Sequence, residues 1–253
     1  EHFIEACAGS GAITAVKPPA LADTLNDVDG EIVNFFRVLR NRVDAAELID
    51  MVSFTPYSRL EFMRALESPR FEQLAGSIAE NDVEAAYNFF IRMQMAVVPG
   101  RTGWSYGVGG ASTRKANKAG RWATMPELLR LCAERFERVQ VEQLDILDLI
   151  KRYDHPTSLF LIDPPYEDET RPNSTGTSSA YTHDQFDHPS MLTAIESGKA
   201  SFAITHYPSK QYDALPWTSV EDYTSHRNIA NSGSGPGRSE AVERLYILDR
   251  SGA

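Results

Sequence analysis

The residues best suited to chemistry in this sequence follow an apolar run at 158–162. They are Asp163, Pro164, Pro165 and Tyr166. The prolines donate no backbone N–H and fix φ, so the turn presents rigid carbonyl acceptors beside the Asp163 carboxylate, with the Tyr166 ring as a stacking face. Such a set accepts both hydrogens of an exocyclic amino group on a planar base. A proline-rich turn after a core strand is the alternative explanation.

The apolar run 158–162 predicts a buried strand of a parallel sheet, and ligands of open α/β sheets bind outside the carboxyl ends of such strands. Residues 3–13 predict a short strand, a small-residue loop and a helix. The loop glycines let the backbone approach a ligand closely, although Gly-x-Gly also occurs in plain tight turns. Asp27 follows about 20 residues later, at the end of the next predicted strand, where an acid binds ribose hydroxyls. Together these features predict a nucleoside-containing cofactor.

With these residues in this order, the chain resembles the Dam-like, alpha-group DNA adenine methyltransferases. Residues 5–11, Glu-Ala-Cys-Ala-Gly-Ser-Gly, are similar to that family's S-adenosylmethionine loop. Asn26-Asp27 is similar to its ribose-binding acid, and Asp163–Tyr166 to its catalytic motif. The resemblance continues through Tyr181, a predicted strand at 201–207 and a closing hairpin, with Arg227, Asn231 and Arg238, before residues 244–248. It covers nearly the whole chain except 50–121, where the family itself varies.

The resemblance implies a Rossmann-like, S-adenosylmethionine-dependent methyltransferase fold: a mostly parallel α/β sheet with a small helical and loop insert that recognises DNA. It predicts a catalytic domain made of 1–48 and 124–253, and a target-recognition insert at 49–123. The implied activity is site-specific methyl transfer from S-adenosylmethionine to the exocyclic amino nitrogen of adenine, after the base is flipped out of the duplex. The implied cofactor contacts are Glu5, Ala8, Gly9, Ser10, Gly11, Asp27, Val28, Asp145, Ile146 and Asp163.

Two features depart from the family's pattern. Cys7 stands where the family usually has an aromatic residue. The family also has a Lys- and Gly-containing segment ahead of the first strand, whereas Glu1 here lies on the predicted strand itself. Two other functions therefore stay open. One is an RNA adenine or guanine-amino methyltransferase, because similar Asp-Pro-Pro-Tyr motifs occur there, and the other is a catalytically weak DNA-binding or cofactor-sensing subunit.

The composition fits one substantial α/β domain with a smaller insert, since the chain has 253 residues of which 42% are hydrophobic. No apolar run approaches ~18 residues and the start has no basic signal-peptide region, so no membrane span is expected. Cys7 and Cys132 are too few for a disulfide framework, and we expect buried thiols of an intracellular protein. The family resemblance implies a cytoplasmic protein, bacterial or phage-encoded. The histidines show no metal-ligand spacing, so no metal is expected.

The net charge of −10 argues against non-specific nucleic-acid binding as the main activity, but the distribution of charge matters more. Residues 85–126 contain no acid, and their basic residues, Arg92 among them, alternate with Trp104, Tyr106 and Trp122. This pattern suits phosphate contact and base stacking, with a solvated loop as the alternative. A second acid-free stretch, 223–239, matches the family's DNA-facing hairpin. Double-stranded DNA is the predicted partner, and the predicted contacts are Arg101, Arg114, Lys115, Lys118, Arg121, Arg227 and Arg238.

Apolar residues at helical spacing predict helices at about 30–48, 46–74 and 81–95, the last of them N-capped by Asn81 or Asp82. Thr124 and Glu127 form a capping-box pattern that predicts another helix start. Residues 139–145 alternate like a strand, so its terminal Asp145 is either a cofactor contact or a helix N-cap. The polar segment 167–179 predicts a mobile loop beside the active site, or a plain disordered connector.

Overall fold

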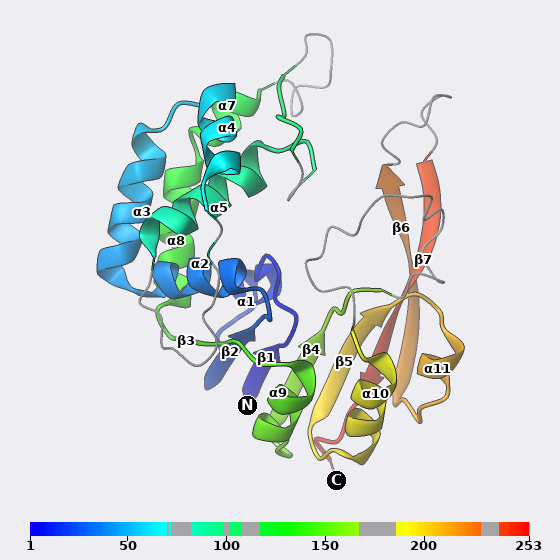
Figure 1. Ribbon diagram of the computed structural model, residues 1–253. Helices are drawn as coiled ribbons and strands as arrows, with labels where there is room; N and C mark the ends of the chain where they lie inside the picture. Colours follow the sequence, from blue (N-terminus) through cyan, green and yellow to red (C-terminus); the bar gives the residue numbers. More distant parts are fainter. Residues whose placement is uncertain are drawn as a thin grey trace. The chain divides into compact units, whose positions relative to one another are not determined.

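The computed structural model describes most of the chain, which Figure 1 shows as a ribbon. The described residues are 1–69, 71, 82–98, 102–107, 117–166, 186–228 and 238–252, without the side chains of 225–228 and 238–241. Contacts divide the chain into two compact units. Unit 1 comprises Glu1–Ala8, Pro18–Asn26 and Leu144–Ala253, and unit 2 comprises Gly9–Lys17 and Asp27–Gln143. The predicted division into a catalytic domain and an insert is a functional one, and it stays a prediction.

The described residues form an α/β structure with a seven-stranded, mostly parallel mixed sheet. Six of its strands belong to unit 1, in the order β2-β1-β4-β5-β7-β6. Their bounds are β1 (His2–Glu5), β2 (Ala22–Asn26), β4 (Ser158–Ile162), β5 (Ser201–His206), β6 (Ser219–Asn228) and β7 (Arg238–Leu248). β1 pairs in parallel with both β2 and β4, and β4 pairs in parallel with β5. The predicted α/β class with a mostly parallel sheet is therefore confirmed.

Alternate residues of β4 and β5 point into the core of unit 1. Phe160 and Phe202 are fully buried partners in the parallel register, and their stacked rings have centroids 5.1 Å apart. Two helices, α9 (Ile146–Tyr153) and α10 (His188–Ser197), bring further apolar side chains to the same core. Burial of each large apolar side chain stabilises the fold by about 1.5–3 kcal/mol. The core thus fixes the position of the strands whose carboxyl ends carry the predicted catalytic residues.

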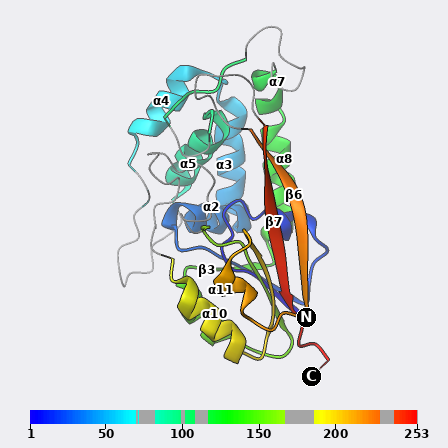
Figure 2. The same ribbon diagram turned by 90° about the vertical axis from the view of Figure 1, so that its right-hand side faces the viewer.

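The sheet of unit 1 ends in a long antiparallel hairpin. β6 pairs with β7 along its whole length, and β7 pairs with β5 in the antiparallel sense. The two hairpin strands lie side by side in both views of the ribbon (Figure 1, Figure 2). This confirms the strand predicted at 201–207 and the hairpin predicted after it. A short helix, α11 (Lys210–Asp213), precedes the hairpin.

Unit 2 is mainly helical. It contains the strand β3 (Val139–Glu142) and the helices α1 (Ala12–Val16), α2 (Gly30–Arg40), α3 (Arg42–Phe54), α4 (Arg59–Glu67), α5 (Val83–Met95), α7 (Lys118–Trp122) and α8 (Met125–Phe136). The N-terminus of α5 is as predicted, because the Asp82 side chain accepts a hydrogen bond from the Ala85 N–H at 2.8 Å.

Two of the predicted helices are interrupted in the structure. The helix predicted at 30–48 breaks at Asn41, which leaves the helical conformation and accepts hydrogen bonds from the Val43 and Asp44 N–H groups as the N-cap of α3. The helix predicted at 46–74 is also wrong as one element. It stops at Phe54 and restarts after Ser58, whose hydroxyl caps α4.

The capping box predicted at Thr124 does not form. Thr124 has the right-handed helical conformation, and its side chain makes no cap hydrogen bond. Its hydroxyl instead donates to the Arg121 carbonyl at 2.8 Å. The helix α8 still begins at the next residue, with a proline in its first turn, where a missing N–H costs nothing.

Both cysteines of the chain are free thiols. Cys7 and Cys132 are each partly buried, whereas the sequence predicted fully buried thiols. Burial raises the pKa of the Cys132 thiol. Among the described residues, no helix has the length and apolar character needed to cross a membrane.

Candidate active site

The segment Asp163–Tyr166 directly follows β4 in unit 1, so its four residues lie at the carboxyl end of a strand with parallel neighbours on both sides. Asp163 is exposed, Pro164 is buried, and Pro165 and Tyr166 are half-buried. The Thr205 hydroxyl, near the end of β5, donates a hydrogen bond to Asp163 Oδ1 at 2.6 Å. The acid is therefore accessible, and one of its two oxygens is held.

The Tyr166 ring is fixed by edge-on contacts with two aromatic residues. Its centroid lies 5.1 Å from that of His206 and 4.7 Å from that of Tyr207, with interplanar angles of 64° and 75°. Burial raises the pKa of the Tyr166 phenol well above its ordinary value, and the nearby charge of Asp163 adds to the rise. Tyr166 is therefore a neutral aromatic ring of defined orientation, as a stacking surface requires.

A cluster of buried aromatic and imidazole rings supports these contacts. The fully buried His206 ring stacks on Tyr212 with centroids 4.2 Å apart and an interplanar angle of 10°. The His206 Nδ1 lies 2.8 Å from the Tyr207 carbonyl, which can only accept, so this nitrogen carries the proton. His188 Nδ1 bonds the Tyr212 hydroxyl at 2.7 Å. The cluster makes the end of β5 a rigid support for Tyr166.

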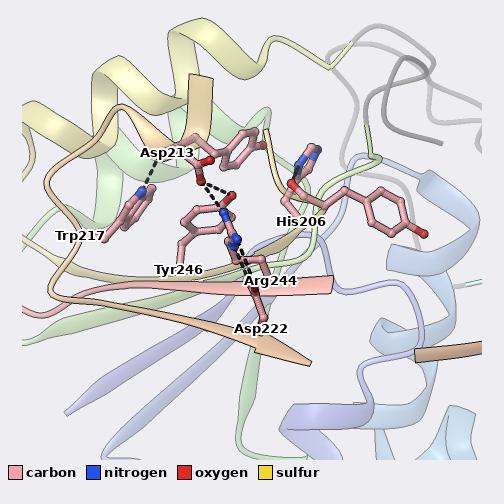
Figure 3. A network of polar contacts seen from close by, with 8 residues as sticks. His206, Asp213, Trp217, Asp222, Arg244 and Tyr246 are labelled. Carbon is pink, nitrogen blue, oxygen red and sulfur yellow. Dashed lines mark hydrogen bonds and ion pairs between the residues drawn. The ribbon is translucent and has the colours of Figure 1, made fainter. Parts of the chain in front are cut away.

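Arg244 on β7 is the centre of a polar network in unit 1 (Figure 3). Its guanidinium donates to both carboxylate oxygens of Asp222 on β6, at 2.5 and 3.0 Å, and to Asp213 of α11 at 2.9 Å. The Tyr246 hydroxyl donates to the same Asp213 oxygen at 2.9 Å. Such bidentate, charge-assisted bonds are among the stronger ones in proteins. Because Arg244 is the register partner of His206, the network also fixes the end of β5.

Asn26, at the end of β2, joins three segments of unit 1 through its buried side chain. Its amide donates to the carbonyls of Ala6 at 2.9 Å and Leu144 at 3.1 Å, and its oxygen accepts from the Leu144 N–H at 2.9 Å. The predicted cofactor contacts Glu5 and Ala8 are also buried beside this junction, since the Ala8 N–H donates to the Asn26 carbonyl. Asn26 thus holds the predicted cofactor-binding end of β1 in place.

The glycine loop and Asp27 belong to unit 2. Gly9 and Gly11 have φ values of 49° and 61°, a left-handed conformation that favours glycine. The Gly9 N–H donates to Asp27 Oδ2 at 2.9 Å, and the Asp29 N–H donates to Oδ1 at 3.0 Å. Burial raises the pKa of Asp27, and these backbone hydrogen bonds oppose the rise.

This arrangement is compatible with a nucleoside-containing cofactor. A carboxylate has about four lone-pair sites, so Asp27 can still accept ribose hydroxyls after its two backbone bonds. A side chain built at Gly9 would meet no atom within 4 Å, so the loop is open on that side. Ser10 and Val28 are exposed on the same unit.

Asp145 is an N-cap in the structure. It is exposed, and its carboxylate accepts a hydrogen bond from the Leu147 N–H at 2.9 Å at the start of α9. Ile146, the next predicted cofactor contact, is buried and belongs to the core of unit 1. The N-cap alternative for Asp145 is therefore confirmed, while its contact with a cofactor stays a prediction.

The predicted DNA contacts are only partly described. Arg101, Arg114 and Lys115 lie outside the described residues, and so do Tyr181 and the segment 167–179. Arg227 and Arg238 are in β6 and β7, with no description of their side chains. Lys118 and Arg121 are on α7, where they line a small pocket together with Tyr57, Gln94, Trp122 and Met125. The structure thus brings two of the predicted cations together.

Two residues of the acid-free stretch are not available for nucleic acid. Arg92 is buried in an ion pair with Glu31 of α2, and it also donates to the Ala65 carbonyl at 2.9 Å. Trp122 is buried, and its indole N–H donates to the Thr55 carbonyl at 2.7 Å. The interpretation of these two residues as phosphate or base contacts is wrong, because both stabilise the interior of unit 2.

Trp104 and Tyr106 remain candidates for base stacking. Their rings are stacked with centroids 5.8 Å apart, and the Arg59 guanidinium lies 4.7 Å from the Trp104 centroid. Tyr106 is 58% exposed, so this stack has a free side.

No known family model matches this chain, and no curated protein sequence matches it either. Among the described residues, no group of three or more His, Cys, Asp or Glu side chains could hold a metal ion.

Sequence reasoning missed Thr205, His206 and Tyr212, which hold the predicted catalytic segment. Thr205 and His206 close the strand that was predicted at 201–207, and this strand is the parallel neighbour of β4. The signal that could have found them is this adjacency, because the carboxyl ends of neighbouring parallel strands meet at one edge of a sheet.

Proposed function

We propose that this chain is a site-specific DNA methyltransferase that transfers a methyl group from S-adenosylmethionine to the exocyclic amino nitrogen of adenine. The observation that carries the proposal is the position of Asp163–Tyr166 at the carboxyl end of a central parallel strand, with the acid held by Thr205. Ligands of open α/β sheets bind at this edge. The mostly parallel sheet is compatible with the Rossmann-like fold that the proposal requires.

The amino nitrogen of adenine is a poor nucleophile, because its lone pair is delocalised into the ring. The Asp163 carboxylate and the Pro164 carbonyl accept its two N–H bonds, which favours a pyramidal nitrogen with an available lone pair. S-adenosylmethionine supplies a methyl group on a positively charged sulfur. The nitrogen forms the new N–C bond while the C–S electron pair stays on sulfur, and the nitrogen then releases one proton to water. Tyr166 stacks on the flipped base and keeps it in line.

The cofactor assignment is supported by the glycine loop and Asp27 of unit 2. Asp27 would accept the ribose hydroxyls, since its carboxylate is oriented by two backbone N–H groups. Gly9 would permit close approach of the cofactor to the backbone. The further contacts at Glu5, Ala8, Ser10, Gly11, Val28, Asp145 and Ile146 come from the family resemblance.

Double-stranded DNA as the partner is supported by the cations Lys118 and Arg121 on α7 and by the stacked aromatic residues Trp104 and Tyr106 of the same unit. Cations of this kind bind phosphates, and exposed rings stack on bases. Base flipping is required because the amino nitrogen cannot reach the methyl group inside the duplex.

The test is methyl transfer by the purified chain from methyl-labelled S-adenosylmethionine to duplex DNA, with the modified nucleosides identified by mass spectrometry. We expect N6-methyladenine. We expect Asp163→Ala to lose about 10²-fold or more in turnover, with cofactor and DNA binding retained, because it removes an acceptor that acts on the reacting group. Asp148→Ala is the matched control, since it removes an exposed carboxylate on α9 of the same unit.

Three outcomes would contradict the proposal. Methylated guanine, or transfer to RNA in place of DNA, would favour the RNA or guanine-amino alternative. DNA or cofactor binding without any transfer would favour a binding or sensing subunit. Turnover of Asp163→Ala within a few-fold of the parent would remove the catalytic role from Asp163.

A further inference from the structure

Thr205 is the one side chain that an observed hydrogen bond joins directly to Asp163 within the described part of the chain. Its hydroxyl lies 2.6 Å from Asp163 Oδ1. Thr205 is half-buried on β5, and Asp163 is exposed directly after β4. The two residues are far apart in sequence, so the contact exists only in the folded sheet.

The sheet register explains why the two side chains meet. Ile162 and Ile204 are parallel partners, and both point into the core. The residues that follow, Asp163 and Thr205, therefore project to the opposite face side by side. β7 pairs with the other edge of β5, where Leu245 is the partner of Thr205. The pairing of Thr205 with β7, together with the β4 pairing of the preceding Ile204, thus fixes its backbone, and its β-branched side chain has few rotamers.

The chemistry of the two groups fixes the direction of the hydrogen bond. An ionised carboxylate only accepts, so the single hydroxyl hydrogen of Thr205 points at Asp163. The hydroxyl group therefore holds Oδ1 of the acid and leaves Oδ2 for another donor.

We propose that Thr205 is a positioning residue for the methyl transfer, which fixes Asp163 through Oδ1 so that Oδ2 faces the amino group of the base. This inference rests on the proposed function. The terminal torsion of an aspartate side chain is broad, so an untethered carboxylate spends much of its time in other orientations. Thr205 removes that freedom before the substrate arrives. It acts through Asp163 and does not touch the reacting atoms.

The test compares Thr205→Val with Thr205→Ser in steady-state methyl transfer to duplex DNA. Valine keeps the branched shape and removes the hydroxyl, so we expect kcat to fall on the order of 10-fold to 100-fold with KM for DNA and cofactor affinity unchanged. Serine keeps the hydroxyl and should restore most of kcat. Thr193→Val is the matched control, since it removes an exposed hydroxyl on α10 that donates to the Pro189 carbonyl of the same helix.

A double-mutant cycle separates positioning from a structural effect. If Thr205 acts only through Asp163, Thr205→Val should cause no further loss of kcat in the Asp163→Ala background. Thermal unfolding shows whether each variant is folded, and Thr205→Ala replaces the valine variant if valine does not fit.

The outcomes distinguish this inference from the proposed function. A parent chain that transfers no methyl group overturns the proposed function, and the inference with it. An active parent with an equally active Thr205→Val, or a serine variant as slow as valine, overturns the positioning role alone. A further loss in the Asp163→Ala background also overturns it.

Discussion

Tyr166 shows how residues that are distant in sequence hold the proposed catalytic segment. Its ring makes edge-on contacts with His206 and Tyr207, and these contacts orient the aromatic face. The roles of the ring and of its hydroxyl group can be tested separately, because phenylalanine keeps the ring and removes the hydroxyl group.

We expect Tyr166→Phe and Tyr166→Trp to retain much of the methyl-transfer activity, and Tyr166→Ala to lose it. The reason is that base–aromatic stacking contributes about 1–3 kcal/mol, and only alanine removes the ring. The measurement is kcat/KM with duplex DNA. If phenylalanine were as damaging as alanine, the hydroxyl would be essential and stacking would not explain the role of Tyr166.

The location of Asp163 could be predicted from the sequence, because a buried apolar run that ends in Asp-Pro-Pro-Tyr indicates a strand and its carboxyl end. The partner of Asp163 could not. Thr205 reaches Asp163 only through the register that pairs Ile162 with Ile204. That register is decided by the packing of both strands against one core, which a pattern within a single strand does not contain.

Among the secondary-structure elements, the ends of helices were harder to predict from the sequence than the helices themselves. Apolar residues at helical spacing continue from α2 into α3, so periodicity alone predicts one helix through Asn41. The break is decided by capping, since the Asn41 side chain accepts from the N–H groups of Val43 and Asp44 at 3.0 and 3.3 Å. The buried pair of Arg92 and Glu31 was equally unpredictable, because it joins helices far apart in sequence.

We expect Asn41→Ala to lower the free energy of unfolding by about 1 kcal/mol, because it leaves two N–H groups at the start of α3 without their acceptor. Asn41→Asp keeps the acceptor and should cost much less. Glu47→Ala is the control, since it changes an exposed residue inside the same helix. Urea unfolding followed by circular dichroism measures all three. Equal stability of Asn41→Ala and the parent would show that the cap does not stabilise α3.

At the scale of the whole molecule, the charge of −10 opposes DNA binding, so any DNA contact must come from a local excess of cations. The described residues that meet this condition in unit 2 include Lys118 and Arg121 on α7. Arg92 does not, because its charge is neutralised in the interior.

We expect the double charge reversal Lys118→Glu and Arg121→Glu to weaken duplex binding and to flatten its salt dependence. Each lost phosphate contact lowers the slope of log affinity against log salt by ~0.9, so two lost contacts lower it by ~1.8. Fluorescence anisotropy over a salt series measures both quantities. Lys151→Glu with Lys199→Glu is the control, because these exposed lysines of unit 1 give the same change in net charge. An unaltered affinity and slope in the α7 variant would place recognition elsewhere.

The strand order of unit 1 has a consequence for how the protein is made. β1 lies between β2 and β4, so His2 pairs with Ala22 on one side and with Ser158 on the other. At about 5–20 residues per second, a ribosome needs roughly 7–26 s to synthesise the chain between β2 and β4. During that time the nascent β1–β2 pair presents an open strand edge, which is a template for pairing with other chains. The middle of the sheet is therefore the part that needs protection during translation, long before its own partner exists.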